Sequence, residues 1–128
     1  MSKKLSIVLA LITGFFLLQS SVESPKDPMP AKFKYSKKVD ELIHSKCYGC
    51  HSAEGRSDKA KKALMWDDLP SMSAADQSHA LEEILEVTEE RSMPPKGMVE
   101  RKPEMGLTDK EVATFQKWAK KMNKRVSK

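Results

Sequence analysis

The chain has 128 residues, with 23 Lys or Arg against 18 Asp or Glu and a formal net charge of +5. Hydrophobic residues make up 39% and charged residues 32%, which fits one small domain with a mixed charged surface. This balance does not indicate binding to nucleic acid. The chain has two cysteines, Cys47 and Cys50, and both lie in one short motif. No thiol is therefore left for a structural disulfide elsewhere.

The first 22 residues have the order of a secretory signal peptide. Lys3 and Lys4 precede an uncharged apolar run, residues 5–18, and small or polar residues follow at 19–24. The run is shorter than the roughly 20 residues that a membrane span needs. We expect cleavage near positions 20–24, which leaves a periplasmic or otherwise exported protein without stable membrane insertion. An uncleaved N-terminal anchor is the alternative, because no A-x-A site is present.

A tether and the first helix are expected next. Residues 23–34 contain three prolines and are expected to form an extended linker. The domain that follows is expected to cover residues 35–124, with a basic tail at 125–128. Its first helix begins near Ser36, because apolar residues then recur at helical spacing, at Val39, Leu42, Ile43 and Cys47.

This helix leads into residues 47–51, which read C-Y-G-C-H. The spacing C-x-x-C-H is the covalent attachment signature of a c-type haem. On a helix, Cys47, Cys50 and His51 share one face. Both sulfurs can therefore form thioether bonds to the haem vinyl groups while the imidazole reaches the iron. The sequence predicts one covalent haem c with His51 as the proximal ligand.

Two other uses of a C-x-x-C pair remain open. A zinc site would need two more ligands, and His44 and His79 are the other histidines besides His51. A thioredoxin-like redox pair would be expected within a βαβ pattern, and no strand-rich run lies near the motif. Both alternatives are less consistent with the sequence than haem attachment.

Two longer helices are expected after the motif. One begins at Ser73 and runs to about Glu90, with an apolar stripe opposite a row of glutamates. The other begins at a full capping box, Thr108 with Glu111, and ends near Lys124. No alternating β pattern occurs, so the expected fold class is all-α.

The segment between these helices, residues 92–98, reads S-M-P-P-K-G-M. The two prolines after Met93 favour extended backbone, and a thioether on a stiff loop suits a distal iron ligand. Met93 is therefore the distal candidate, so that His51 and Met93 are the expected iron ligands. Met98 on the same loop and His79 on the preceding helix are weaker alternatives, and an open or water-occupied position is another.

The chain is similar to small class I cytochromes c, and more closely to the haem-binding domain family of exported monohaem proteins. The similarity covers about residues 36–122 and rests on four stretches, at 47–52, 81–84, 93–95 and 107–119. It implies a small helical domain wrapped around one haem, with His51 proximal and Met93 in the matching distal position.

Two departures from these relatives leave part of the site open. Class I cytochromes c carry a Gly-Pro-x-Leu loop after the haem motif, whose proline carbonyl accepts the Nδ1 proton of the proximal histidine. Here the first downstream proline is Pro70, so the sequence does not identify the partner of His51. The family also tends to place Gly before Met-Pro-Pro and an aromatic residue soon after it, where this chain has Ser92 and Met98.

The expected function is that of a one-electron carrier, cycling between Fe(III) and Fe(II), that exchanges electrons with a redox partner protein. No distal His-Arg pair is apparent, so we do not expect the chain to be an enzyme on its own. Lys59, Lys61 and Lys62 could steer docking to an acidic partner or could simply be solvated. A binder or sensor of a small gas such as NO or CO, and a small haem subunit of a larger oxidoreductase, are the alternatives.

Overall fold

The computed structural model describes residues 33–128, and this part of the chain contains helices and turns but no strand. Its helices are α1 (Lys37–Leu42), α2 (Asp58–Ala63), α3 (Ala74–Glu89), α4 (Lys96–Arg101) and α5 (Asp109–Val126). Three short turns join them: the π-helical η1 (Ile43–Cys47) and the 3₁₀-helical η2 (Leu69–Ser71) and η3 (Pro103–Met105). The all-α prediction is confirmed for the described residues. The expected signal peptide and most of the expected tether lie outside them.

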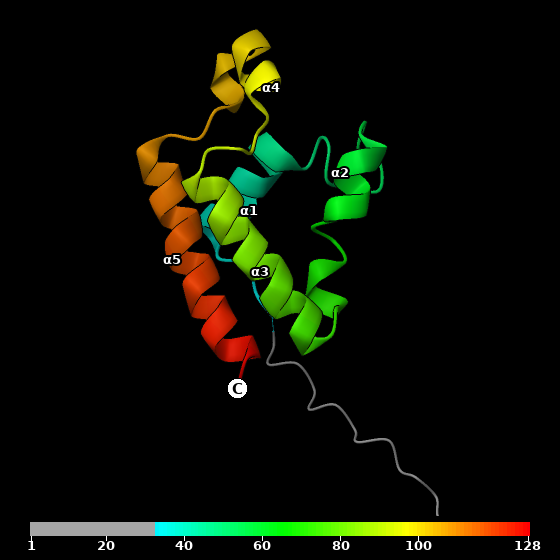
Figure 1. The fold of residues 1–128 in the computed structure, drawn as a ribbon, viewed down its shortest axis with the longest axis vertical. Coiled ribbons are helices and arrows are strands. Elements are labelled where there is room, and N and C mark those ends of the chain that lie inside the picture. Colours follow the sequence, from blue (N-terminus) through cyan, green and yellow to red (C-terminus); the bar gives the residue numbers. More distant parts are fainter. Residues whose placement is uncertain (1–32) are drawn as a thin grey trace, which may run out of the picture.

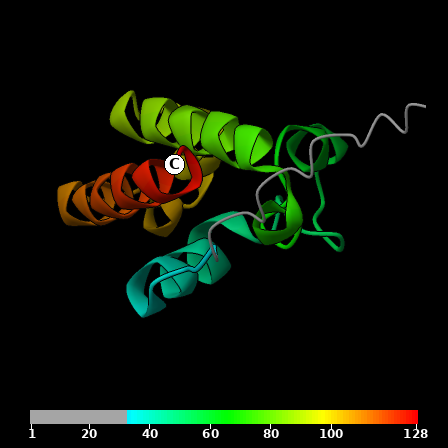
Figure 2. The same ribbon diagram turned by 90° about the horizontal axis from the view of Figure 1, so that it is seen from below.

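The centre of the fold is the antiparallel pair α3 and α5, which lie side by side (Figures 1 and 2). Their opposite directions are fixed at one end by a hydrogen bond from Ser78 Oγ to Asn123 Oδ1, at 2.6 Å. Both predicted starts are confirmed, because Ser73 caps α3 and the Thr108–Glu111 capping box of α5 is complete. Helix α5 continues to Val126, beyond the predicted end, because the Val126 side chain is buried. The expected basic tail therefore begins inside the helix.

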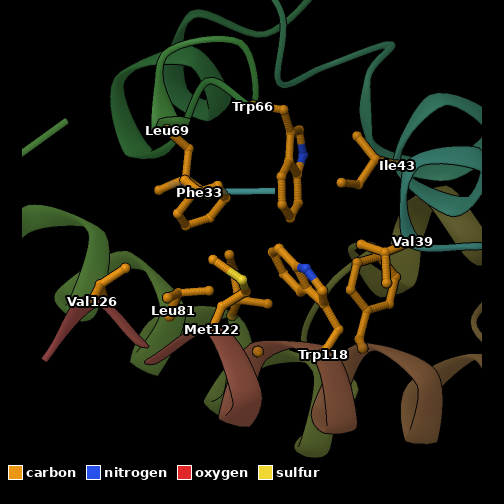
Figure 3. Close-up of a cluster of buried hydrophobic side chains, with 12 residues drawn as sticks. Phe33, Val39, Ile43, Trp66, Leu69, Leu81, Trp118, Met122 and Val126 are labelled. Carbon is orange, nitrogen blue, oxygen red and sulfur yellow. The ribbon is translucent and has the colours of Figure 1, made fainter. Parts of the chain in front are cut away.

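Aromatic side chains fill the space between α5 and the segment before α1 (Figure 3). The rings of Phe33 and Trp118 lie edge to face with centroids 6.0 Å apart. Trp118 Nε1 also donates a hydrogen bond to the carbonyl oxygen of Lys34, at 3.0 Å. The residues that enter the domain are thus held against α5 by apolar contact and by a satisfied indole N–H.

The first helix differs from the prediction where it meets the cysteine motif. Instead of continuing as an α-helix, it widens into η1, in which the Tyr48 N–H donates to the Ile43 carbonyl five residues earlier, at 2.8 Å. Such π turns are frequent at functional sites. The Cys47 carbonyl then accepts from the N–H groups of Cys50 and His51, at 3.1 and 3.0 Å. One helical turn is thereby kept across the motif.

The segment between α3 and α5, residues 92–107, is called the strap here. Met93 is non-helical and Pro95 is extended, as predicted, but helix α4 begins directly after Pro95, where only a loop was expected. A proline suits this position, since the first N–H groups of a helix need no intrahelical acceptor. Helix α4 packs chiefly against η3, within the strap itself, and lies at one end of the molecule (Figure 1). In the described residues no helix is both long and apolar enough to cross a membrane.

Candidate cofactor site

The cysteine motif and the strap border the same cavity. Its volume is about 470 Å³, within the range of pockets that hold small molecules and cofactors, roughly 300–1,000 Å³. Helices α2, α3 and α5 supply most of the remaining wall. The motif contributes Cys47, Cys50 and His51, and the strap contributes all three of its methionines, Met93, Met98 and Met105. The structure therefore brings together the predicted attachment residues, the predicted proximal ligand and the thioether candidates.

The ring of His51 is oriented by the backbone of the segment after α2. His51 Nδ1 lies 2.8 Å from the carbonyl oxygen of Leu64. A carbonyl oxygen only accepts, so Nδ1 must carry the proton of this hydrogen bond, and Nε2 of the neutral ring keeps its lone pair. The backbone N–H of Trp66 donates a hydrogen bond to the backbone carbonyl oxygen of His51, at 3.1 Å. Two hydrogen bonds thus hold the motif to residues 64–66.

The Leu64 carbonyl is the partner that the sequence did not identify. It comes from a leucine 13 residues after His51. A backbone acceptor leaves no signature in residue type. The apolar residues around Trp66 indicate packing in this segment, but they do not indicate this hydrogen bond.

Gly55 allows the chain to turn back closely against the motif. A Cβ atom at this position would lie 2.4 Å from the Cys50 carbonyl oxygen and 2.9 Å from that of Ser52. The Arg56 N–H donates to the Gly49 carbonyl at 3.1 Å, which closes the turn on the motif itself. Both contacts are with backbone, so a larger residue at position 55 could not be accommodated by a side-chain movement.

The Cys47 thiol does not have the character of the attacking thiol of a redox pair. Burial raises the pKa of the Cys47 thiol to about 12, so it is neutral and weakly nucleophilic near neutral pH. An attacking thiol in a redox pair needs the opposite, a lowered pKa. A zinc site has no support either, since residues 33–128 contain no group of three or more His, Cys, Asp or Glu side chains that could hold a metal ion.

Arg91 closes one side of the base of the strap. It follows α3 directly and has a φ of 58°, in the left-handed region where glycine is the usual residue. Its guanidinium group donates to the Leu107 carbonyl and to the Asp109 carboxylate at the start of α5. The first and last residues of the strap are therefore held close together.

Lys46, the residue before the first cysteine, also binds the base of the strap. Its Nζ donates to the Gly106 carbonyl at 2.6 Å and to Glu111 Oε2 at 2.8 Å. Burial would raise the pKa of Glu111, but hydrogen bonds from Lys46 and Thr108 and the charge of Lys46 outweigh it and hold this pKa below its usual value. The sequence gave no indication of this link, which joins residues 65 positions apart.

The other two histidines lie elsewhere. His79 is 74% exposed on α3 and pairs with Glu83 at 3.4 Å, so the structure does not bring it to the cavity. His44 is exposed on η1 and stacks on the ring of Tyr48, with centroids 4.6 Å apart. Of the three histidines, only His51 lines the cavity.

The three strap methionines differ in burial. Met93 is 38% exposed and is the one exposed large hydrophobic residue in the described part of the chain. Met98 and Met105 are half-buried. Met93 also lines a second, smaller cavity of about 300 Å³ on the strap. The structure thus places Met93 at the rim of the main cavity. It also brings Met98 and Met105 to the wall of this cavity.

Comparison of the chain with protein-family models, with curated proteins and with solved structures finds no match. The function is therefore argued from the residues of the site.

Proposed function

We propose that the chain is a c-type cytochrome with one haem, held by thioether bonds to Cys47 and Cys50, that acts as a one-electron carrier in an exported compartment. The observation that carries the proposal is the set His51, Cys47 and Cys50 on one cavity, with the Nδ1 of His51 bonded to a backbone carbonyl. That hydrogen bond leaves Nε2 for iron and increases its basicity. When bound, the haem iron would supply reversible one-electron transfer between its ferric and ferrous states.

The remaining wall of the cavity fits an apolar macrocycle with acidic substituents. Apolar side chains from α3 and α5, such as Ile84 and Phe115, line it. Trp66 also lines it, and its Nε1 is buried with no hydrogen-bond partner in the described chain. A buried N–H of this kind is costly unless an acceptor satisfies it. Lys59 and Arg101, also in the wall, supply positive charge for the propionate groups of a haem.

The chain's own groups would keep this site in one arrangement during electron transfer. The two hydrogen bonds to residues 64–66 hold the His51 ring, and the bonds of Lys46 and Arg91 close the base of the strap that carries Met93. A thioether of the strap, with Met93 as the first candidate, would hold the iron together with His51. Lysines near the cavity, such as Lys59, would favour an acidic redox partner.

Absorption spectroscopy and extraction of the purified, exported protein test this proposal. We expect a red protein whose colour stays with the polypeptide in acidified organic solvent, and whose Cys47→Ala/Cys50→Ala variant loses it. A colourless protein, or pigment that extracts freely, would contradict the proposal. The control is a Met122→Leu variant, which alters the core but not the attachment residues.

A binder of a small gas such as CO or NO is the second candidate. The exposure of Met93 favours it, because a thioether at the cavity rim is easier to displace than a buried one. Rapid CO binding by the ferrous protein, together with no methionine-to-iron absorption band in the ferric protein, would support the binder over the carrier. Slow or absent CO binding with that band present would support the carrier.

A further inference from the structure

Helix α5 has two faces of opposite character with the same spacing. The buried residues Phe115, Ala119, Met122 and Val126 recur at intervals of four, three and four. Lysines recur at the same intervals two positions later, at Lys117, Lys121, Lys124 and Lys128. Two residues correspond to a rotation of about 200° around a helix, so the lysines lie opposite the core. These four, with Lys110 one helical repeat before them, are called the lysine face.

The lysine face is exposed and uncompensated. All five of its residues are exposed, and none forms an ion pair within the described part of the chain. No Asp or Glu follows Glu111 in the sequence. Asp109 and Glu111 flank Lys110 in the sequence, but both are bound elsewhere, to Arg91 and Lys46. Helix α5 forms one edge of the molecule in Figure 1, and no described element covers its outer side.

The composition of this face favours a lipid surface over a protein partner. From Lys110 to Lys124 it forms a row about 21 Å long, at 1.5 Å per residue, and Lys128 follows two residues after the helix ends. It contains no aromatic or large apolar residue, and protein interfaces are depleted in lysine and depend on aromatic or arginine anchors. A plane of anionic headgroups needs no such anchor, since each lysine contributes by its charge alone.

The buried face of α5 shows which side of the domain would be turned away from such a surface. The described chain begins at Phe33, packed on Trp118, and the Lys34 carbonyl accepts a hydrogen bond from the same indole. Phe115 is buried on the side of α5 opposite the lysines and lines the cofactor cavity, so contact at the lysine face would leave that cavity uncovered.

We propose that the lysine face of α5 binds the anionic headgroups of a lipid surface and orients the domain with its cofactor cavity directed away from that surface. The interaction is electrostatic, so it weakens with salt as the screening length falls from about 10 Å at 0.1 M to about 3 Å at 1 M. It does not depend on the identity of the cofactor.

Sedimentation with lipid vesicles tests the proposal on the protein as it is isolated, with the bound fraction measured on gels. Two vesicle types are compared, phosphatidylcholine alone and phosphatidylcholine with phosphatidylglycerol. We expect binding to the anionic vesicles that is lost in high salt. A lysine contributes about fivefold, so the Lys117→Gln/Lys121→Gln/Lys124→Gln variant should bind roughly a hundredfold more weakly.

The matched control removes the same charge elsewhere, at the exposed residues Lys62, Lys96 and Lys102. This triple Gln variant should keep most of the binding. Equal losses in the two variants would mean that net charge alone is responsible, and would overturn the proposal. So would equal binding to both vesicle types, which would assign it to the N-terminal segment, or no binding at low salt, which would leave an acidic protein as the partner.

Discussion

The Lys46 ammonium group lies 2.8 Å from the Glu111 carboxylate, so the residue before the first cysteine is joined directly to the first turn of α5. Lys46 is 13% exposed and Glu111 is 23% exposed. Pairs that are this well shielded contribute more than surface ion pairs, and removing one partner leaves the other charge poorly solvated.

Replacing Glu111 with Gln should lower the free energy of unfolding by about 1–3 kcal/mol near neutral pH, because the buried Lys46 charge loses its partner. The pKa of Glu111 is lowered in the fold, so its stabilising contribution is complete above the ordinary glutamate pKa and is lost as the pH falls below about 4.3. The difference between wild type and variant should therefore shrink at acidic pH. Urea unfolding across this range measures it, with the exposed Glu100→Gln as control, and a difference independent of pH would argue against the assignment.

Gly55→Ala should destabilise the domain by about 1–3 kcal/mol or more, because the added Cβ would meet the backbone carbonyl of Cys50 at 2.4 Å. Gly49→Ala is the matched control, since nothing lies within 4 Å of a Cβ there. Thermal unfolding of both variants gives the comparison. Equal midpoints for the two would mean that the turn can relax.

Arg91→Gly separates backbone strain from the side-chain contacts. Glycine adopts the left-handed conformation more readily, so a purely conformational role predicts a more stable variant. We expect a less stable one, by about 1–2 kcal/mol, together with faster amide hydrogen exchange throughout the strap, because the bonds to Leu107 and Asp109 are lost. Asp109→Asn should give a smaller effect of the same sign. A stabilised Arg91→Gly variant with unchanged exchange would refute this role of the guanidinium group.

Single alanine variants of Met93, Met98 and Met105 identify the distal ligand. We expect the near-infrared methionine-to-iron band to disappear only in Met93→Ala. Met122→Ala should keep the band but lose about 2–5 kcal/mol of stability, because Met122 is buried in the core. If Met93→Ala keeps the band and Met98→Ala loses it, the ligand is Met98 on α4.

The parts of the fold that follow from local rules were predictable. Ser73 and Thr108 start helices through hydrogen bonds to residues three positions away, so the signal is contained in a few neighbouring letters. Helix α4 was not predicted, because the two prolines were taken only to favour extended backbone, although a proline is compatible with the start of a helix. The π turn η1 was missed because its hydrogen bond is a choice of acceptor one residue further back, which side-chain periodicity does not specify.

The candidate site divides in the same way. The cysteines and His51 carry their chemistry in their spacing, and the structure brings them to one cavity. The residues that hold this motif in place have no such signature in the sequence. Leu64 contributes only a backbone carbonyl, and Lys46 binds a residue 65 positions away. Arg91 could have been noticed in the sequence, because it stands just after the predicted end of a helix, at a position where glycine is usual.

The strap leaves the helical pair and returns to it at almost the same place, where Arg91 and Lys46 bind the carbonyl groups of its last residues, Leu107 and Gly106. A segment attached in this way resembles a replaceable module, since its interior can gain, lose or exchange residues without altering how α3 and α5 meet. Grafting strap sequences of different length and methionine content onto an unchanged scaffold would thus give a family of proteins that differ chiefly in the surroundings of one cavity.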